Sequence, residues 1–148
     1  MISQKCQYAI RTMFELARRA GSPAPVQAKD IAAAQAIPLR FLKVILGQLR
    51  NAGLVSARRG RDGGYTLARP PAAITVGELI RVVQGPLLMV DCPPGGDRDC
   101  ALAGRCVFRD MWRRAETAVD AVFDGTTLKT LVDADRARAA KSGGIYDI

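Results

Sequence analysis

Histidine is absent from this chain of 148 residues. Its absence excludes catalytic triads built on histidine, zinc sites with histidine ligands and histidine proton switches near neutral pH. The sequence also lacks a glycine-rich phosphate loop followed by Lys and Ser or Thr, and it shows no convincing pair of nucleophile and base. We therefore predict that the protein is not an enzyme.

Long apolar runs are absent as well. No stretch reaches about 18 consecutive apolar residues, the length that a transmembrane helix requires. The N-terminal stretch Met1–Gln7 lacks the apolar run of a secretory signal peptide. We expect no membrane association and a cytoplasmic location.

Acidic residues are few relative to basic ones. The chain has 22 Lys and Arg against 14 Asp and Glu, which gives a net charge of +8 and a pI near 9.9. This balance favours a polyanionic partner such as nucleic acid, although charge alone does not prove one. A hydrophobic content of 49% is ample for the core of one domain, or of one compact domain with a helical extension.

Helical periodicity dominates the first third of the chain and predicts a mainly α fold. Ser3 is placed to cap a helix that runs to Ala20. Two shorter helical patterns follow, over Ala28–Gln35 and Leu39–Asn51, and the turn between them carries Pro38 at the start of the second helix. Two helices joined by a short turn predict a helix-turn-helix.

The second of these helices has the pattern of a DNA recognition helix. Apolar residues on one face, Leu42, Ile45, Leu46 and Leu49, suit burial. Pro38, Arg40 and Lys43 fall at its exposed start, which would enter the major groove first. Arg40 suits guanine edges and phosphates equally. The alternative is that these cations only solvate a surface helix.

A small β-hairpin is predicted directly after this helix. Residues 54–57 and 65–68 read as strands, and the glycine-rich loop between them carries Arg58, Arg59 and Arg61. This composition is typical of a wing that lies along the phosphate backbone. Helix, turn, helix and basic wing in this order predict a winged helix-turn-helix that binds DNA.

The rest of the chain predicts a helical extension. A short helix capped by Thr75 ends at Gly85, and a long amphipathic helix begins near Val107. Its apolar stripe suits a two-fold dimer, and the alternative is packing on its own winged domain. We predict these units: residues 1–72, a winged helix-turn-helix; 73–106, a short helix and cysteine loop; 107–135, a dimerisation helix and C-terminal helix; 136–148, a flexible tail.

A cluster of cysteines lies between the two helices of this extension. Cys92, Cys100 and Cys106 fall within fifteen residues. In a reducing compartment such a cluster suits metal binding or redox chemistry, and thiolates are the soft ligands that iron–sulfur clusters and zinc prefer. Three cysteines without histidine leave a tetrahedral zinc site one ligand short. The alternatives are a cluster-free thiol–disulfide or zinc-dependent regulator and, more remotely, an iron–sulfur electron carrier.

Several motifs together resemble the IscR/NsrR-type transcription regulators, the Rrf2 family. They are Gln7–Arg11, Gly53–Val55, Arg59–Gly60, Gly63–Tyr65, Ile74–Ile80 and the cysteine triplet. The resemblance implies a homodimer that binds palindromic promoter DNA, with Pro38, Arg40 and Lys43 in the major groove and Arg59 at the minor groove. It also implies an iron–sulfur cluster held by the three cysteines. Cluster type, two-iron or four-iron, the signal, and repression or activation stay open.

A fourth ligand to the cluster is not obvious from the sequence. The gap between the first two cysteines is longer than is usual in the family, Arg109 stands where some members carry histidine, and Gln7 stands where others carry a carboxylate. Cys6, Gln7 and Asp110 are the candidates. For Cys6 the alternative is a small buried apolar residue, the commoner role of a lone cysteine.

Overall fold

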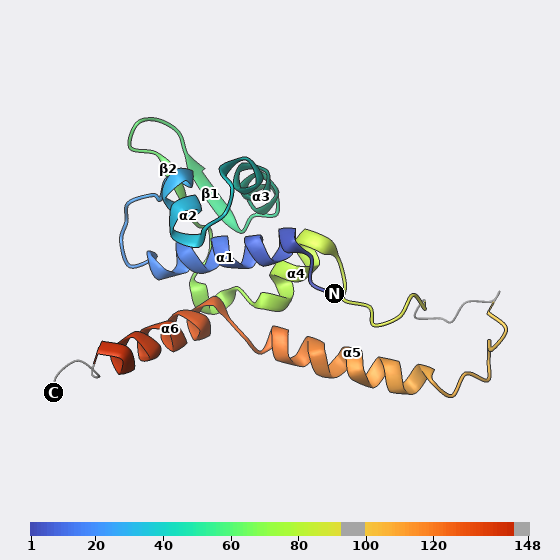
Figure 1. The fold of residues 1–148 in the computed structure, drawn as a ribbon. Helices are drawn as coiled ribbons and strands as arrows, with labels where there is room; N and C mark the ends of the chain where they lie inside the picture. The colour runs from blue at the N-terminus through green and yellow to red at the C-terminus, as the bar shows by residue number, and fades with distance from the viewer. Residues whose placement is uncertain (93–99, 144–148) are drawn as a thin grey trace.

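The computed structural model describes residues 1–92 and 100–143. Within these ranges the chain is mainly helical with a small antiparallel hairpin, which confirms the predicted fold class (Figure 1). The elements in chain order are α1 (Gln4–Arg18), α2 (Ala28–Gln35), α3 (Leu39–Asn51), β1 (Val55–Arg58), β2 (Gly64–Leu67), the 3₁₀ turn η1 (Pro71–Ala73), α4 (Val76–Gln84), α5 (Arg109–Asp124) and α6 (Leu128–Gly143).

Local capping explains where the helices begin and turn. The Ser3 hydroxyl accepts a hydrogen bond from the Cys6 backbone N–H, and Thr75 caps α4 in the same way through Glu78. Helix α2 ends at Ala36, whose backbone is left-handed with φ of 49°. Pro38 is the N-cap of α3. The chain thus reverses between α2 and α3 within three residues, as the predicted helix-turn-helix requires.

Helix α1 lies at the centre of the fold. Figure 1 shows α2, α3 and the hairpin on one side of it, with α4 and the start of α6 on the other. Its inward residues meet the apolar faces of α3 and α4, both of which follow helical period. The core that results includes Met13, Leu16, Ile31, Leu42, Ile45, Leu46, Leu49, Leu54, Ile74, Leu79, Ile80 and Leu128.

Each strand of the hairpin lies one residue nearer to the loop than predicted. Strand β1 covers Val55–Arg58 and β2 covers Gly64–Leu67, with Arg58 opposite Gly64. Leu54 is instead fully packed in the core, where its carbonyl still accepts from the Ala68 N–H at 3.0 Å. Arg58 therefore belongs to the end of β1 and not to the loop.

Helix α5 is largely exposed. Figure 1 shows it running alone beside the body and joining it near α4. The Arg81 guanidinium lies 2.6 Å from the Asp124 carboxylate at that junction. None of the residues of α5 is buried: Phe123 packs partly against the core, whereas Trp112 and Val122 of the predicted apolar stripe are exposed. No helix within the described ranges is long and apolar enough to cross a bilayer.

The C-terminal segment differs from the prediction. We expected a flexible tail from residue 136, but α6 continues without a break to Gly143. Alanine, arginine and lysine, which are frequent in residues 134–141, have high helix propensity, so the charged composition does not end the helix. Residues 144–148, the rest of the predicted tail, lie outside the described residues.

Candidate DNA-binding surface and cysteine pocket

Helix α3 presents the predicted recognition residues to solvent. Its Leu42, Ile45, Leu46 and Leu49 are buried against the body of the protein. Pro38, Arg40 and Lys43 are exposed at or near its N-terminal end. The structure therefore supports the geometry in which the start of α3 approaches a partner while its opposite face holds the core.

Sequence reasoning missed three apolar residues on this same helix. Leu39, Phe41 and Val44 are 40%, 47% and 64% exposed. The guanidinium of Arg40 lies over the Phe41 ring, with its central carbon 4.7 Å from the ring centroid. The helical period could have revealed Val44, because it falls opposite the four buried residues of α3.

The wing places a second group of cations beside α3. Arg58, Arg59 and Arg61 are all exposed, and Figure 1 shows the wing loop and α3 on the same side of α1. In the part of the chain that the structure describes, neither these arginines nor Arg40 and Lys43 form an ion pair with an acidic side chain. Five cations that form no ion pair within the described residues suit the phosphates of a nucleic acid.

Two glycines fix the shape of the wing. A Cβ on Gly63 would lie 2.2 Å from the carbonyl oxygen of Arg58, so only glycine fits there. Gly64 has φ of +150°, and a Cβ on it would lie 2.5 Å from the Val26 carbonyl oxygen. These close approaches let the loop fold back on β1 and let β2 pair with Val26.

A buried carboxylate ties the helix-turn-helix to α1. Glu15 is 1% exposed, and its carboxylate accepts from Arg19 Nε at 2.7 Å and from Gln35 Nε2 at 2.9 Å. Gln35 is the last residue of α2, and its backbone carbonyl also accepts from the Arg11 guanidinium. The end of α2, directly before the recognition helix, is thus held by two side chains of α1.

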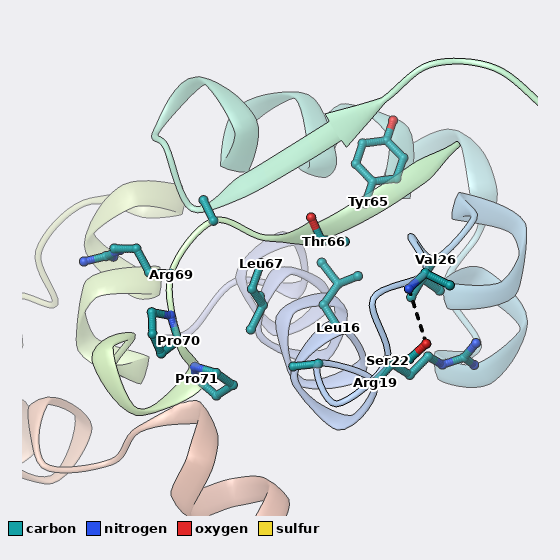
Figure 2. A pocket seen from close by; sticks show the side chains of 13 residues that line it. Leu16, Arg19, Ser22, Val26, Tyr65, Thr66, Leu67, Arg69, Pro70 and Pro71 are labelled. Carbon is teal, nitrogen blue, oxygen red and sulfur yellow. Dashed lines mark hydrogen bonds between the residues drawn. The ribbon is translucent and has the colours of Figure 1, made fainter. Parts of the chain in front are cut away.

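A groove of about 440 Å³ lies between the end of α1, strand β2 and η1. Figure 2 shows Leu16, Leu67 and Val26 along it, with Pro70 and Pro71 at one end. Its two arginines are engaged elsewhere: Arg19 with Glu15, and Arg69 with Glu78 at 2.5 Å. The groove therefore offers apolar walls and no free cation that is directed at a ligand.

The three predicted cysteines come together at the N-terminal end of α5. Cys92, Cys100 and Cys106 line one open pocket of about 380 Å³, and Asp110 of the first turn of α5 lines it too. An apolar pocket of about 320 Å³ adjoins it and shares Cys92 and Cys106 with it. The walls of this apolar pocket include Leu88, Val90, Phe108 and Trp112. Figure 1 shows this region at the end of the molecule away from the wing.

Three thiols and one carboxylate line the cysteine pocket, and thiolates are the ligands that iron–sulfur clusters prefer. Among the described residues, no three Cys, Asp or Glu side chains converge closely enough to hold one metal ion. The stretch 93–99, which contains the prolines and glycines of the loop, lies outside the described residues.

The three candidates for a fourth ligand occupy different places. Cys6 is 0% exposed in the core, and this burial raises the pKa of its thiol, which disfavours the thiolate that a metal requires. Its position matches the buried apolar role that we considered. Gln7 is exposed on α1, where its amide donates to the Ile2 carbonyl at 3.3 Å. Only Asp110 lines the pocket together with the three cysteines.

Comparison with known proteins settles the family. The family model Rrf2, described as an iron-dependent transcriptional regulator, matches residues 2–134. The chain belongs to the Rrf2 family. The resemblance found in the sequence motifs is therefore confirmed, and the hairpin with its basic loop is the wing of an Rrf2 winged helix-turn-helix.

Named relatives and solved structures agree with this Rrf2 assignment. The chain is 39% identical to the regulator CymR of Bacillus subtilis, over 88% of each chain. It is 34% identical to the repressor NsrR of Streptomyces coelicolor, over 85% of this chain and 84% of the relative. The structure of B. subtilis CymR, the global cysteine regulator, matches with a TM-score of 0.77 and 38% identity, over 90% of this chain and 97% of that one.

Two further solved structures of Rrf2 regulators match the chain. IscR of T. potens superposes with a TM-score of 0.75 at 35% identity, over 93% of this chain and 90% of that one. The oxidised form of Staphylococcus aureus CymR superposes with a TM-score of 0.70 at 33% identity, over 89% and 95%. The protein is a DNA-binding transcription regulator and not an enzyme, and the electron-carrier alternative is wrong.

Proposed function

We propose that this Rrf2 protein is a homodimeric sensor that regulates promoters according to redox state, nitric oxide or iron–sulfur status. In this proposal an iron–sulfur cluster is held by Cys92, Cys100 and Cys106, with Asp110 as the fourth ligand. The observation that carries the proposal is that these four residues line one pocket. The description of the family as iron-dependent supports it.

Dimerisation through α5 is part of the proposal. Its apolar residues stay uncovered within the chain: Met111 is 50%, Trp112 37% and Val122 65% exposed. Burying such a stripe against a second copy removes it from water, and a two-fold axis presents two winged domains to the two halves of a palindrome. Promoter DNA with a palindromic operator is the partner that we expect. Pro38, Arg40 and Lys43 would enter the major groove, and Arg58, Arg59 and Arg61 would lie along the backbone or minor groove.

The contacts around the pocket suggest how its state reaches the winged domain. The Glu116 carboxylate of α5 accepts from the Met89 backbone N–H at 2.9 Å, so the segment before Cys92 is held on α5. At its other end α5 is joined to α4 by the Arg81 and Asp124 pair. A bound cluster would supply redox reactivity and a fixed loop geometry. Loss or oxidation of the cluster would move α5, and this movement would change the relative placement of the two winged domains in the dimer.

The first experiment is the visible absorption spectrum of protein purified without oxygen, with iron and acid-labile sulfide assayed on the same sample. We expect a brown chromophore that Cys92→Ala, Cys100→Ala and Cys106→Ala each remove. Cys6→Ala is the matched control and keeps the colour. A colourless protein after attempted reconstitution would contradict the cluster.

Operator binding tests the other half of the proposal. Arg59→Ala is expected to weaken binding and to flatten its salt dependence, because one phosphate contact fewer releases fewer counterions. Cys100→Ala is expected to bind the operator with one fixed affinity, which no longer responds to oxidant or nitric oxide. Unchanged binding by Arg59→Ala would contradict the wing assignment, and an unchanged response in Cys100→Ala would contradict the sensor.

A second candidate is a regulator that uses the same thiols without a cluster. Its support is the exposure of Cys92 and Cys100 and the match to an oxidised form of S. aureus CymR. A peroxide would take two protons and two electrons from two thiols, which form a disulfide while the peroxide is reduced to water. Mass spectrometry of the peroxide-treated chain would show the loss of two hydrogens. A zinc assay on the same colourless protein tests the zinc-dependent form of this candidate.

A further inference from the structure

The outer face of α3 carries an apolar side chain that the core does not use. Val44 is 64% exposed, whereas Leu42, Ile45, Leu46 and Leu49 of the same helix are at most 2% exposed. Val44 lies one helical turn after Arg40, so both side chains share the face that points away from the protein. This face is the one that the proposed docking presents to the major groove.

Val44 is open to an approaching partner in the part of the chain that the structure describes. Gly47, one turn further along, has no side chain, and the space where its Cβ would lie is empty to 4 Å. The Phe41 ring lies under the guanidinium of Arg40, the residue one helical turn before Val44. A close contact between Val44 and a partner is therefore sterically open, and a cation that packs on an aromatic ring lies on the same face of the helix.

The chemistry around Val44 restricts what this contact can be. Arg40 and Lys43 lie on the same exposed surface, and neither they nor the arginines of the wing form an ion pair within residues 1–92 and 100–143. Such a surface complements the phosphates of DNA. Within the major groove the thymine 5-methyl is the apolar group on the base edges, since the other groups there are hydrogen-bond donors and acceptors.

We propose that α3 recognises a thymine in each half of the operator through its 5-methyl group, with Val44 as the contact and Phe41 holding Arg40 in place beside it. This inference rests on the proposed docking of α3 in the major groove. It assigns Val44 as a specificity-determining residue. Removing the methyl group or the valine side chain should each cost affinity, and the two losses should not add.

The experiment begins with selection of bound duplexes from a random pool by the full-length protein, which gives the operator. Each thymine of that operator is then replaced by deoxyuridine, which removes only the methyl group, and Kd is measured by fluorescence anisotropy at fixed salt. We expect one position per half-site at which the replacement weakens binding about fourfold, and about fifteenfold when both halves are changed, from the free energy of burying one methyl group each.

Variants at position 44 complete a double-mutant cycle with the uracil operators. Val44→Ala should bind the uracil and thymine operators equally at that position, whereas Val44→Ile should keep the preference for thymine. Both variants are at an exposed helical site, so circular dichroism should show unchanged folding. The inference is overturned if uracil costs nothing in the native protein, or if Val44→Ala keeps the full uracil penalty. Failure to select any sequence would instead contradict the proposed docking.

Discussion

Gln48 of the recognition helix donates a hydrogen bond of 2.9 Å to the carbonyl of Val82, near the C-terminal end of α4. The same amide lies 3.5 Å from the Val83 carbonyl. Carbonyls at the end of a helix have no partner within the helix, so Gln48 satisfies a group of α4 while it ties α4 to α3. Helix α4 continues into the segment that reaches Cys92, so this contact is one direct link between that segment and the proposed DNA-binding surface.

Gln48→Ala should lower the free energy of unfolding by about 1 kcal/mol, because it removes a partly buried hydrogen bond and leaves a carbonyl of α4 without its partner. Urea denaturation measures this change. Arg50→Ala, on the exposed face of the same helix, is the control and should stay within about 0.5 kcal/mol. Equal stability of Gln48→Ala and the native protein would show that the contact carries no energy.

Gly63→Ala should distort the wing, since its Cβ would lie 2.2 Å from the Arg58 carbonyl oxygen. Backbone cannot yield as a flexible side chain does, so we expect a loss of about 1–3 kcal/mol in stability and weaker operator binding. Gly21→Ala is the matched control, because nothing lies within 4 Å of that position. Thermal unfolding and anisotropy on the selected operator check both expectations, and a Gly63→Ala protein that behaves like Gly21→Ala would contradict the close approach.

Glu15→Ala should lower the free energy of unfolding by about 1–3 kcal/mol, because the Gln35 amide and the Arg19 guanidinium lose a charged acceptor in a buried setting. The loss should also loosen the end of α2 and weaken operator binding. Asp135→Ala removes a partly exposed carboxylate 3.8 Å from Arg18 and should change stability by less than about 1 kcal/mol. Denaturation of the two variants side by side tests the difference.

Alkylation of the cluster-free native protein should modify Cys92, Cys100 and Cys106 and spare Cys6. The first two thiols are exposed and the third is partly exposed, whereas Cys6 is buried and burial raises its pKa above the ordinary value of 9.0. Peptide mapping after iodoacetamide treatment, with and without denaturant, measures this. Rapid modification of Cys6 in the native state would contradict its burial.

The same thiol predicts a pH dependence of stability. With its pKa raised in the folded state, the contribution of Cys6 is complete below 9.0 and declines as pH rises above that value, because the unfolded chain ionises first. Stability measured between pH 8 and about pH 10 should therefore fall more steeply for the native protein than for Cys6→Ala. If the stability of Cys6→Ala fell with pH as steeply as that of the native protein, Cys6 would not be the group responsible.

Elements with local signals could be predicted from the order of residues. Ser3 and Thr75 mark helix starts because a cap bonds to a backbone group only three residues away. The period of the apolar residues in 39–51 identified the buried face of α3, and the arginines and glycines of 58–64 identified the wing. The bounds of the hairpin shifted by one residue because pairing across the sheet and the packing of Leu54 fix them, and no local signal carries either.

Contacts between elements could be seen only in the folded protein. The burial of Cys6 and the hydrogen bond from Gln48 to α4 join segments that are distant in sequence, and the arrangement of Asp110 and the three cysteines around one pocket depends on the path of the chain between them. Such properties depend on packing between elements, which the order of residues specifies only through the whole fold.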